Sequence, residues 1–232
     1  MREPLIIGHR GASAVAPENT IAAFQAAIDA DADGIEFDVR LSRDGVPVII
    51  HDDTLYRTHG VRQRVNELTA DELRRVDVPM LRELFELMAP NNLILCLEIK
   101  ASAPELPDLC CRLVDEFSFR ERVIVECFDL SVLKALDPWF KTAALFEPRI
   151  YPDRNLIDRA LAIGASVLAL HYRLANPTLV EKAKSAGLKV VVWTVDDPAW
   201  IERARSMGIE ALITNDPATM IEAADRIRVQ LS

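Results

Sequence analysis

The sequence is poor in the residues that stabilise small domains through disulfide bonds or bound zinc. Its 232 residues include four cysteines, with no C-x-x-C pair, and only 6% are aromatic. We interpret the cysteines as buried thiols in a reducing compartment rather than as disulfides or zinc ligands. No apolar run approaches the roughly 20 residues of a membrane-spanning helix, and the apolar stretch 5–7 is too short for a signal-peptide core. These absences predict a cytoplasmic protein without stable membrane insertion.

The chain also lacks a positive charge excess and several common catalytic motifs. Its formal net charge is −9, which argues against nucleic acid as a partner because affinity for a phosphate backbone comes from Lys and Arg. The eight glycines never occur as G-x-G, and there is no G-x-x-x-x-G-K-[ST], G-x-S-x-G or H-E-x-x-H. Hydride transfer, nucleotide hydrolysis, serine esterase and zinc protease chemistry therefore lose support.

What the chain does contain is ample apolar sequence for a core. Half of the residues are apolar, and we expect residues 1–232 to form a single domain. In the second half, a helical stretch ending in glycine is followed three times by a short apolar run, at 165–170, 188–193 and 209–214. Each run precedes a helix-start signal, a capping side chain before proline, at Asn176-Pro177, Asp197-Pro198 and Asp216-Pro217.

Similar apolar runs occur in the first half of the chain. They lie at 5–8, 34–38, 93–99, 122–127 and 142–146, with one helix expected at 20–31 and another opened by Asp129. Eight such runs separated by helices are typical of an α/β fold, the parallel (β/α)8 TIM barrel. The active site of a barrel of this kind lies where its strands end.

One apolar run breaks this alternation. The run 46–50 follows the second strand after only four residues, and the Asp44-Gly45 pair between alternating apolar positions is a strong hairpin signal. A two-residue turn there places Asp38 opposite His51, with Cβ atoms about 5 Å apart. We therefore expect a hairpin excursion and a small cap, over about residues 39–80, that project above the barrel rim.

Acidic residues stand at the ends of two of the predicted strands, where unpaired charge is costly. Glu36 and Asp38 are two residues apart and point to one face, and Glu98 and Lys100 share a face in the same way. The three carboxylates make a hard oxygen site of the type that binds Mg²⁺ or Ca²⁺. Ordinary exposed acids and a buried Glu98–Lys100 salt bridge would give the same pattern without a metal.

The first predicted strand ends in His9 and Arg10. Arginine binds phosphate oxygens with two donors at once, and histidine exchanges protons near neutral pH. A lone histidine is more often structural than catalytic. His9 and His51, however, are both expected at one rim with three acids, Arg10 and Lys100. This set favours metal-assisted attack at phosphorus, with one histidine as base and the other as acid.

These residues lie in motifs that resemble the glycerophosphodiester phosphodiesterase family in order and spacing. The matching segments are Gly8-His9-Arg10-Gly11, Pro17-Glu18-Asn19-Thr20, Glu36-Phe37-Asp38-Val39, His51-Asp52, Arg57-Thr58, Pro79-Met80-Leu81, Leu97-Glu98-Ile99-Lys100, Val192-Trp193-Thr194-Val195 and Ile213-Thr214-Asn215-Asp216-Pro217. The resemblance covers nearly the whole chain. It implies a barrel phosphodiesterase that cleaves glycerophosphodiesters to glycerol 3-phosphate and an alcohol.

The resemblance also implies a role for individual side chains. Glu36, Asp38 and Glu98 match the ligands of a divalent metal, His9 and His51 the catalytic histidines, Arg10 and Lys100 the phosphate-contacting positions, and Trp193 a residue near the glycerol. Attack by the glycerol hydroxyl of the substrate, through a cyclic phosphate, and direct attack by water both remain open.

The chain departs from the family pattern at two places. Cys127-Phe128 stands where Ser-Phe is common, which predicts altered packing or one changed polar contact, with activity kept. The segment 60–79 is short, which predicts a reduced cap and a site open to a bulkier alcohol group. Two side chains have alternative roles: His171 either reaches the substrate at the rim or stays at the surface, and Asn19 is expected as a helix N-cap with Thr20 as the alternative.

Two other functions fit the same motifs. A lysophospholipase D or a sphingomyelinase D-like phosphodiesterase would differ in substrate profile. A catalytically silent barrel that binds phosphodiesters or a protein partner would need a broken site, and every matched position is filled here. We therefore predict a metal-dependent hydrolase of glycerol and lipid metabolism with a small-molecule substrate, and the sequence leaves the oligomeric state open.

Overall fold

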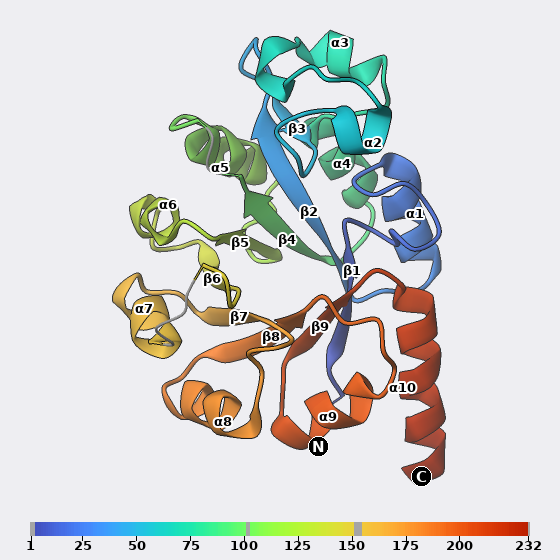
Figure 1. The fold of residues 1–232 in the computed structure, drawn as a ribbon, viewed down its shortest axis with the longest axis vertical. Helices are drawn as coiled ribbons and strands as arrows, with labels where there is room; N and C mark the ends of the chain where they lie inside the picture. Colours follow the sequence, from blue (N-terminus) through green and yellow to red (C-terminus); the bar gives the residue numbers. More distant parts are fainter. Residues whose placement is uncertain (1–2, 101–102, 151–154, 232) are drawn as a thin grey trace.

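The parallel strands form a closed barrel. The computed structural model describes residues 3–100, 103–150 and 155–231, and within these ranges eight parallel strands pair in a ring in which β1 lies between β2 and β9. They are β1 (Leu5–His9), β2 (Gly34–Leu41), β4 (Ile94–Ile99), β5 (Val123–Cys127), β6 (Lys141–Phe146), β7 (Val167–His171), β8 (Lys189–Trp193) and β9 (Ala211–Thr214). Figure 1 shows helices around this ring. The predicted (β/α)8 barrel is confirmed.

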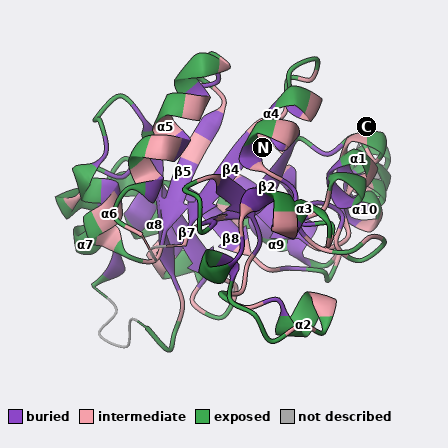
Figure 2. Ribbon diagram, turned by 90° about the horizontal axis from the view of Figure 1, so that it is seen from above, coloured by how far each residue is buried: buried purple, intermediate pink, exposed green. Residues whose placement is uncertain are grey.

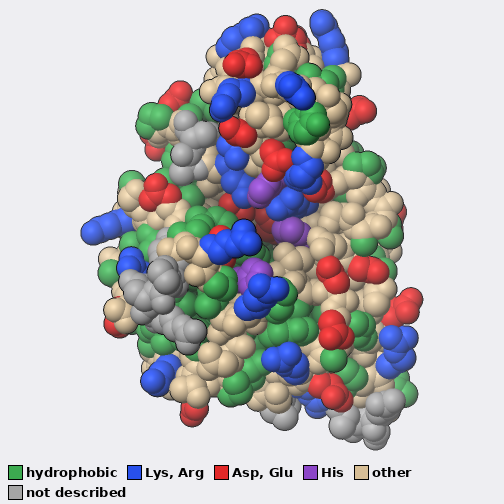
Figure 3. Space-filling view, viewed as in Figure 1, with side chains coloured by type: hydrophobic (Ala, Val, Ile, Leu, Met, Phe, Trp, Pro, Cys, Tyr) green, Lys and Arg blue, Asp and Glu red, His purple; other side chains and the backbone are tan. Residues whose placement is uncertain are grey.

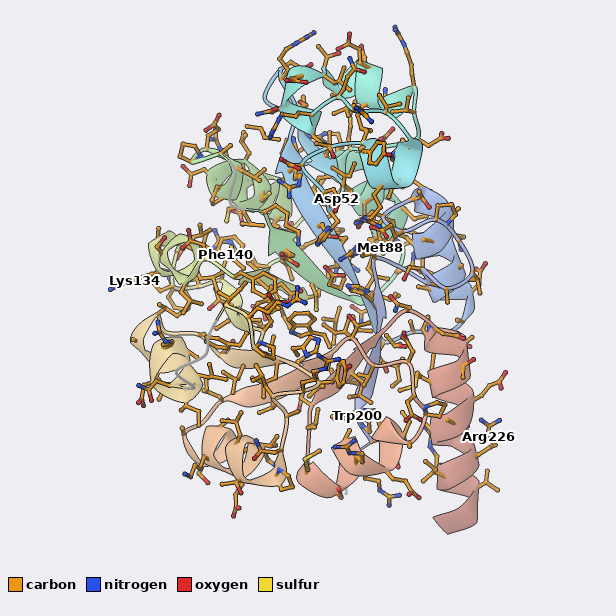
Figure 4. All side chains as sticks on the ribbon, in the orientation of Figure 1. Asp52, Met88, Lys134, Phe140, Trp200 and Arg226 are labelled. Carbon is orange, nitrogen blue, oxygen red and sulfur yellow. The ribbon has the colours of Figure 1, made fainter. Side chains whose placement is uncertain are left out.

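The helices cover the outside of the barrel with one buried face each (Figure 2). They are α1 (Ile21–Asp29), α4 (Leu81–Met88), α5 (Leu106–Glu116), α6 (Leu130–Ala135), α7 (Leu156–Ala162), α8 (Pro177–Ser185), α9 (Trp200–Met207) and α10 (Pro217–Leu231). Met88 and Trp200 are buried between helix and strand, whereas Lys134 and Arg226 point outward (Figure 4). No helix in the described ranges combines the length and apolar character needed to cross a membrane.

Side chains along each strand alternate between two buried layers. Phe37 and Leu97 face outward and pack in the cluster under the helices. Ile7, Ala143 and Ile213 face inward and help to fill the barrel interior. Toward the carboxyl ends of the strands the inward positions become polar, and this change of side-chain type creates the site described below.

An excursion after β2 forms a small cap, as expected from the sequence. This cap segment comprises β3 (Pro47–Ile49), α2 (Tyr56–His59), the 3₁₀ helix η1 (Val65–Glu67) and α3 (Ala70–Arg74), and lies at the top of Figure 1. It has its own apolar cluster of buried side chains, which are Val48, Ile50, Leu55, Val65, Leu68, Ala70, Leu73 and Val78. The cluster gives the segment a fixed position beside the barrel mouth.

The hairpin of β2 and β3 has a different register from the predicted one. The Ile50 N–H donates to the Asp38 carbonyl at 3.0 Å, so Asp38 pairs with Ile50, and the prediction that it faces His51 was wrong by one residue. The turn is a three-residue loop, 43–45, because Gly45 adopts the left-handed region at φ 77° and adds one residue to the turn. His51 therefore lies beyond the end of the strand pairing.

Three of the predicted helix starts are confirmed and one was early. Asn176 and Asp129 cap α8 and α6, and Asp216 caps α10 by accepting a hydrogen bond from a backbone N–H three residues on. The start at Asp197-Pro198 was wrong by two residues, since α9 begins at Trp200 after a turn that the Asp197 carboxylate stabilises.

The first helix is capped by Thr20, and the expectation that Asn19 caps it was wrong. The Thr20 hydroxyl accepts from the Ala23 N–H at 3.2 Å and donates to the Pro17 carbonyl at 2.7 Å. Asn19 sits one residue earlier in the left-handed region, at φ 57°, and its side chain turns inward to Asp38. The amide is therefore used in the site instead of at the helix end.

Thr20→Ala should lower the free energy of unfolding by about 1 kcal/mol, because a helix start loses its cap. Urea unfolding of the two proteins measures the change. Thr178→Ala is the matched control, since Thr178 is exposed in the first turn of α8, which Asn176 caps. A Thr20→Ala protein as stable as wild type would contradict the assignment of this cap.

Candidate active site

A cavity of about 300 Å³ opens where the barrel strands end, a size suited to a small molecule. Seven of the predicted site residues line it: His9, Arg10, Glu36, His51, Glu98, Lys100 and Trp193. In the space-filling view, histidine, basic and acidic side chains gather at the centre of this face below the cap segment (Figure 3). Phe128, Leu145 and Ile213 give the cavity an apolar side.

Three buried carboxylates from two neighbouring strands meet beside the cavity, and two of them, Glu36 and Glu98, line it. Glu36, Asp38 and Glu98 each offer an oxygen atom, and these atoms lie within 4.8 Å of one another. They come together because β2 and β4 pair with Asp38 opposite Glu98, while Glu36 is two residues earlier on the same face. Burial, reinforced by the neighbouring acids, raises the pKa of Glu36. Oxygen donors in this number suit Mg²⁺ or Ca²⁺, and a cation would relieve their mutual repulsion.

Two basic side chains compensate part of this negative charge. Lys100 Nζ lies 2.8 Å from Asp38 Oδ1 and is paired with Glu98 as well, and Arg10 Nε lies 3.2 Å from Asp38 Oδ2. Burial opposes ionisation of Asp38, but Lys100 and Arg10 outweigh it and lower the pKa of that carboxyl. At Glu98 burial dominates and raises the pKa to about 7. The expected Glu98–Lys100 pair is present, within a larger cluster.

The loop after β1 holds the carboxylates in place. The Arg10 backbone N–H donates to Glu36 Oε2 at 3.0 Å, and Asn19 Nδ2 donates to Asp38 Oδ2 at 2.7 Å. Arg10 and Asn19 both adopt positive φ, 55° and 57°, a conformation that costs energy in residues other than glycine. These hydrogen bonds orient the acids in the way that outer-shell groups orient metal ligands.

Hydrogen bonds fix which nitrogen of His9 carries the proton. Asn215 donates from both its backbone N–H and Nδ2 to the Asp196 carboxylate, each at 2.8 Å. A carboxylate only accepts, so the Asn215 Oδ1 atom must face His9 and accept from its Nδ1, at 2.7 Å. The Nε2 atom of His9 is left as an acceptor, 3.9 Å from Glu36 Oε2. Burial, with Arg10 adding to it, lowers the pKa of His9 to about 4.

A second chain of polar contacts anchors His51. Its Nδ1 lies 2.6 Å from the Asp52 carboxylate, which also accepts from Arg57 Nε at 2.7 Å. Arg57 then binds both oxygens of Glu18, and Glu18 accepts from Arg10 as well. Asp52 belongs to the cap segment, in the loop between β3 and α2 (Figure 4). These contacts connect the cap segment to the loop after β1. His51 is therefore positioned by the cap segment, whereas His9 is positioned by Asn215.

Two of the nine predicted site residues, Asp38 and His171, do not line the cavity. The His171 ring packs edge-on against the Trp193 ring, with 5.3 Å between the two ring centroids. Cys127 points away from the cavity into the core, where its Sγ donates to the Ile99 carbonyl at 3.1 Å. The replacement of serine at this position thus affects packing at the barrel wall.

The sequence patterns did not predict several residues of the site, or predicted them without their contacts. Glu126 lines the cavity and is 2% exposed, and its signal was an acid inside an otherwise apolar run. Asn215, Glu18 and Asp52 belong to matched motifs, which gave no indication of which side chains they contact. Asp196 had no signal at all, since it lies between strand and helix like many solvated acids.

Comparison with known proteins places this arrangement among phosphodiesterases. The model of the glycerophosphoryl diester phosphodiesterase family matches residues 9–219. The glycerophosphodiester phosphodiesterase of Caldanaerobacter subterraneus subsp. tengcongensis is 35% identical over 236 residues, which cover 94% of this chain and 96% of that protein.

Solved structures show the same similarity. A glycerophosphodiester phosphodiesterase from Thermotoga maritima superimposes with a TM-score of 0.82 at 29% identity and covers 96% of this chain and 99% of its own. A phosphodiesterase from Oleispira antarctica, solved in complex with the product sn-glycerol-3-phosphate, has a TM-score of 0.87 at 26% identity, with 96% and 97% covered.

Proposed function

The chain belongs to the glycerophosphoryl diester phosphodiesterase family and is a phosphodiesterase, and we propose that it hydrolyses glycerophosphodiesters to glycerol 3-phosphate and an alcohol, with a bound Mg²⁺ or Ca²⁺ and a pair of histidines. One observation carries the proposal. Two of three clustered, buried carboxylates, Glu36 and Glu98, border a single cavity together with two histidines that are anchored through Nδ1. These are the groups that cleavage of a phosphodiester requires.

Glu36, Asp38 and Glu98 would hold the cation. When bound, it would neutralise charge on the phosphodiester and polarise its P–O bonds. Arg10 and Lys100 line the cavity beside these acids, and their donors would bind phosphate oxygens. A phosphodiester bound in this way would have its phosphorus between His9 and His51, which both line the cavity.

The two histidines would divide the proton transfers. We assign the base to His9, because its Nε2 is an acceptor and its lowered pKa, about 4, keeps the ring neutral at neutral pH. It would take the proton of the attacking hydroxyl, either that of the glycerol or that of water. Burial, with Lys100 and Arg10 adding to it, lowers the pKa of His51. His51 would still protonate the leaving oxygen, because Asp52 stabilises its imidazolium form and a bound phosphate would offset the charges of Lys100 and Arg10.

Release of glycerol 3-phosphate from glycerophosphocholine tests this function. Purified protein should turn over with Mg²⁺ or Ca²⁺ and lose about 100-fold or more of its rate in EDTA, because the three acids alone repel the substrate. Glu98→Gln should raise the divalent concentration needed for half of the activity. Glu147→Gln is the matched control, as Glu147 borders the cavity outside the carboxylate cluster.

The results separate the alternatives. Undiminished turnover in EDTA would remove the metal from the mechanism. Silence with every cation, combined with turnover of a lysophospholipid or sphingomyelin, would replace the proposed substrate by those of a phospholipase D-type enzyme.

We also propose a cytoplasmic location, which the four free thiols support. For His171 we propose a role at the substrate through its packing on Trp193.

A further inference from the structure

The cavity contains a buried acid that the proposed chemistry does not use. Glu126 lies on β5 opposite Glu98 of β4 and Ala143 of β6. Its side chain faces the interior of the barrel and borders the cavity, and the residue is only 2% exposed. It stays outside the group of three carboxylates whose oxygen atoms lie within 4.8 Å of one another. Its position therefore requires another explanation than metal binding.

The Glu126 carboxyl group has no hydrogen-bond or ion-pair partner among the residues that the structure describes. Glu98, Asp38 and Lys100 interact with it through space, and it acts in turn on Glu36. Burial, with Glu98 and Asp38 adding to it, raises its pKa. The carboxyl oxygens reach the cavity instead of being sealed in the core, and in either protonation state they can accept a hydrogen bond from a hydroxyl. A ligand in the cavity is the partner that would satisfy them.

The surroundings of Glu126 select a particular kind of ligand. It is level with Glu98 in the strand pairing, and therefore lies deeper in the barrel than Lys100, two residues further along β4. In the ring of strands, β5 faces β9, which contributes Ile213 to the opposite wall of the cavity, and Trp193 of β8 lies beside it. One wall can thus accept a hydroxyl hydrogen bond, and the facing wall is apolar except for the buried Nε1 of Trp193, which has no hydrogen-bond partner among the described residues.

We propose that Glu126 is a specificity-determining residue, whose carboxyl group receives the terminal hydroxyl of the glycerol moiety while Ile213 and Trp193 pack on its carbon face. The inference rests on the proposed function and adds to it the recognition of the polyol. Glycerol fits the two walls because its hydroxyls lie along one edge of a short carbon chain. A phosphodiester of the same shape without the terminal hydroxyl would leave Glu126 buried and unpaired.

A pair of substrates measures this contact directly. Glycerophosphocholine is compared with its deoxy analogue, the phosphocholine diester of propane-1,2-diol, which keeps the inner hydroxyl and lacks the terminal one. Wild-type protein should prefer glycerophosphocholine in kcat/KM by about 10- to 100-fold, as expected for a hydrogen bond to a carboxyl group. Glu126→Ala should reduce the preference to about twofold or less.

Two further variants exclude a general structural effect. Glu126→Gln keeps an acceptor oxygen and should keep most of the preference. Glu147→Ala removes a carboxylate at the same cavity and should leave the ratio of the two substrates unchanged. A Glu126→Ala enzyme that retains the wild-type preference would overturn the proposal. So would a variant that changes only the relative rates of choline and uncharged headgroups, because Glu126 would then contact the leaving alcohol.

A binding measurement separates this proposal from the proposed function. Calorimetry with Mg²⁺ present compares glycerol 3-phosphate with 2-hydroxypropyl phosphate, its analogue without the terminal hydroxyl. Wild-type protein should bind the former about tenfold more tightly, and Glu126→Ala should bind both alike. This holds even if glycerophosphocholine is not turned over. Equal affinities in wild type would refute the role of Glu126 whatever the reaction.

Discussion

His51→Ala should lower kcat for glycerophosphodiester hydrolysis by about 1000-fold, the loss expected when one proton-transfer group is removed. His51 borders the cavity and lies outside the strand pairing, so its imidazole contributes little to the barrel. Circular dichroism and the thermal midpoint should therefore stay near wild type. Steady-state release of glycerol 3-phosphate with saturating Mg²⁺ measures the effect.

His59→Ala is the control for this variant. His59 is a histidine of the same cap segment, on α2, and it does not border the cavity. It should retain full activity, which shows that the loss in His51→Ala comes from the missing proton transfer and not from a disturbed cap. Activity of His51→Ala within a few-fold of wild type would remove this residue from the mechanism.

Asp196→Asn should lower kcat by about 100-fold with KM changed less than about threefold, although Asp196 does not border the cavity. Its carboxylate accepts hydrogen bonds from the backbone N–H and Nδ2 of Asn215, and this orients the amide so that Oδ1 accepts from His9. An amide at position 196 can donate as well as accept, so Asn215 can turn and favour the other tautomer of His9. That tautomer has no lone pair on Nε2.

Exchange of the two side chains should restore the activity. In Asp196→Asn with Asn215→Asp, the new amide donates to the new carboxylate, which again accepts from His9 Nδ1. We expect kcat within about threefold of wild type. Nitrogen-15 NMR of the His9 ring, assigned with His9→Asn, should show the Nδ1–H form in wild type and in the exchanged protein.

Ser13→Ala is the matched control for this series. Ser13 Oγ donates to the same Asn215 Oδ1 at 2.9 Å but does not determine how the amide is turned. It should change neither the tautomer nor kcat appreciably. Observation of the Nε2–H form in wild-type protein would contradict the positioning role of Asp196 and Asn215, even if every variant were well folded.

The barrel could be predicted because its information is local. Each unit of helix, glycine and short apolar run is visible within about two dozen residues, and strand ends of a parallel barrel meet at one rim. The residues at those ends were predicted for the same reason. His9, Glu36 and Glu98 needed only their place at the end of a strand to be expected at one site, and the structure brings them to one cavity.

The errors arose where one residue or one side-chain contact decides the outcome. The left-handed conformation of Gly45 lengthened the hairpin loop and shifted Asp38 from His51 to Ile50. Two-residue and three-residue loops differ by a small local free energy, which the cap segment can override. Asn19 failed as a cap because its amide finds Asp38, a contact between residues far apart along the chain.

The sequence by itself determined the fold, the family and the types of chemical group at the rim. It did so because hydrophobic periodicity, turn residues and short motifs act over a few residues. Only the tertiary structure decided that Asp196 orients His9 through Asn215. It also decided that Glu18 binds both Arg10 and Arg57. Finally, it placed Glu126 at the cavity without a partner among the described residues. These relations depend on distances of a few ångströms between strands and loops that are distant in sequence, and only closure of the barrel brings those segments together.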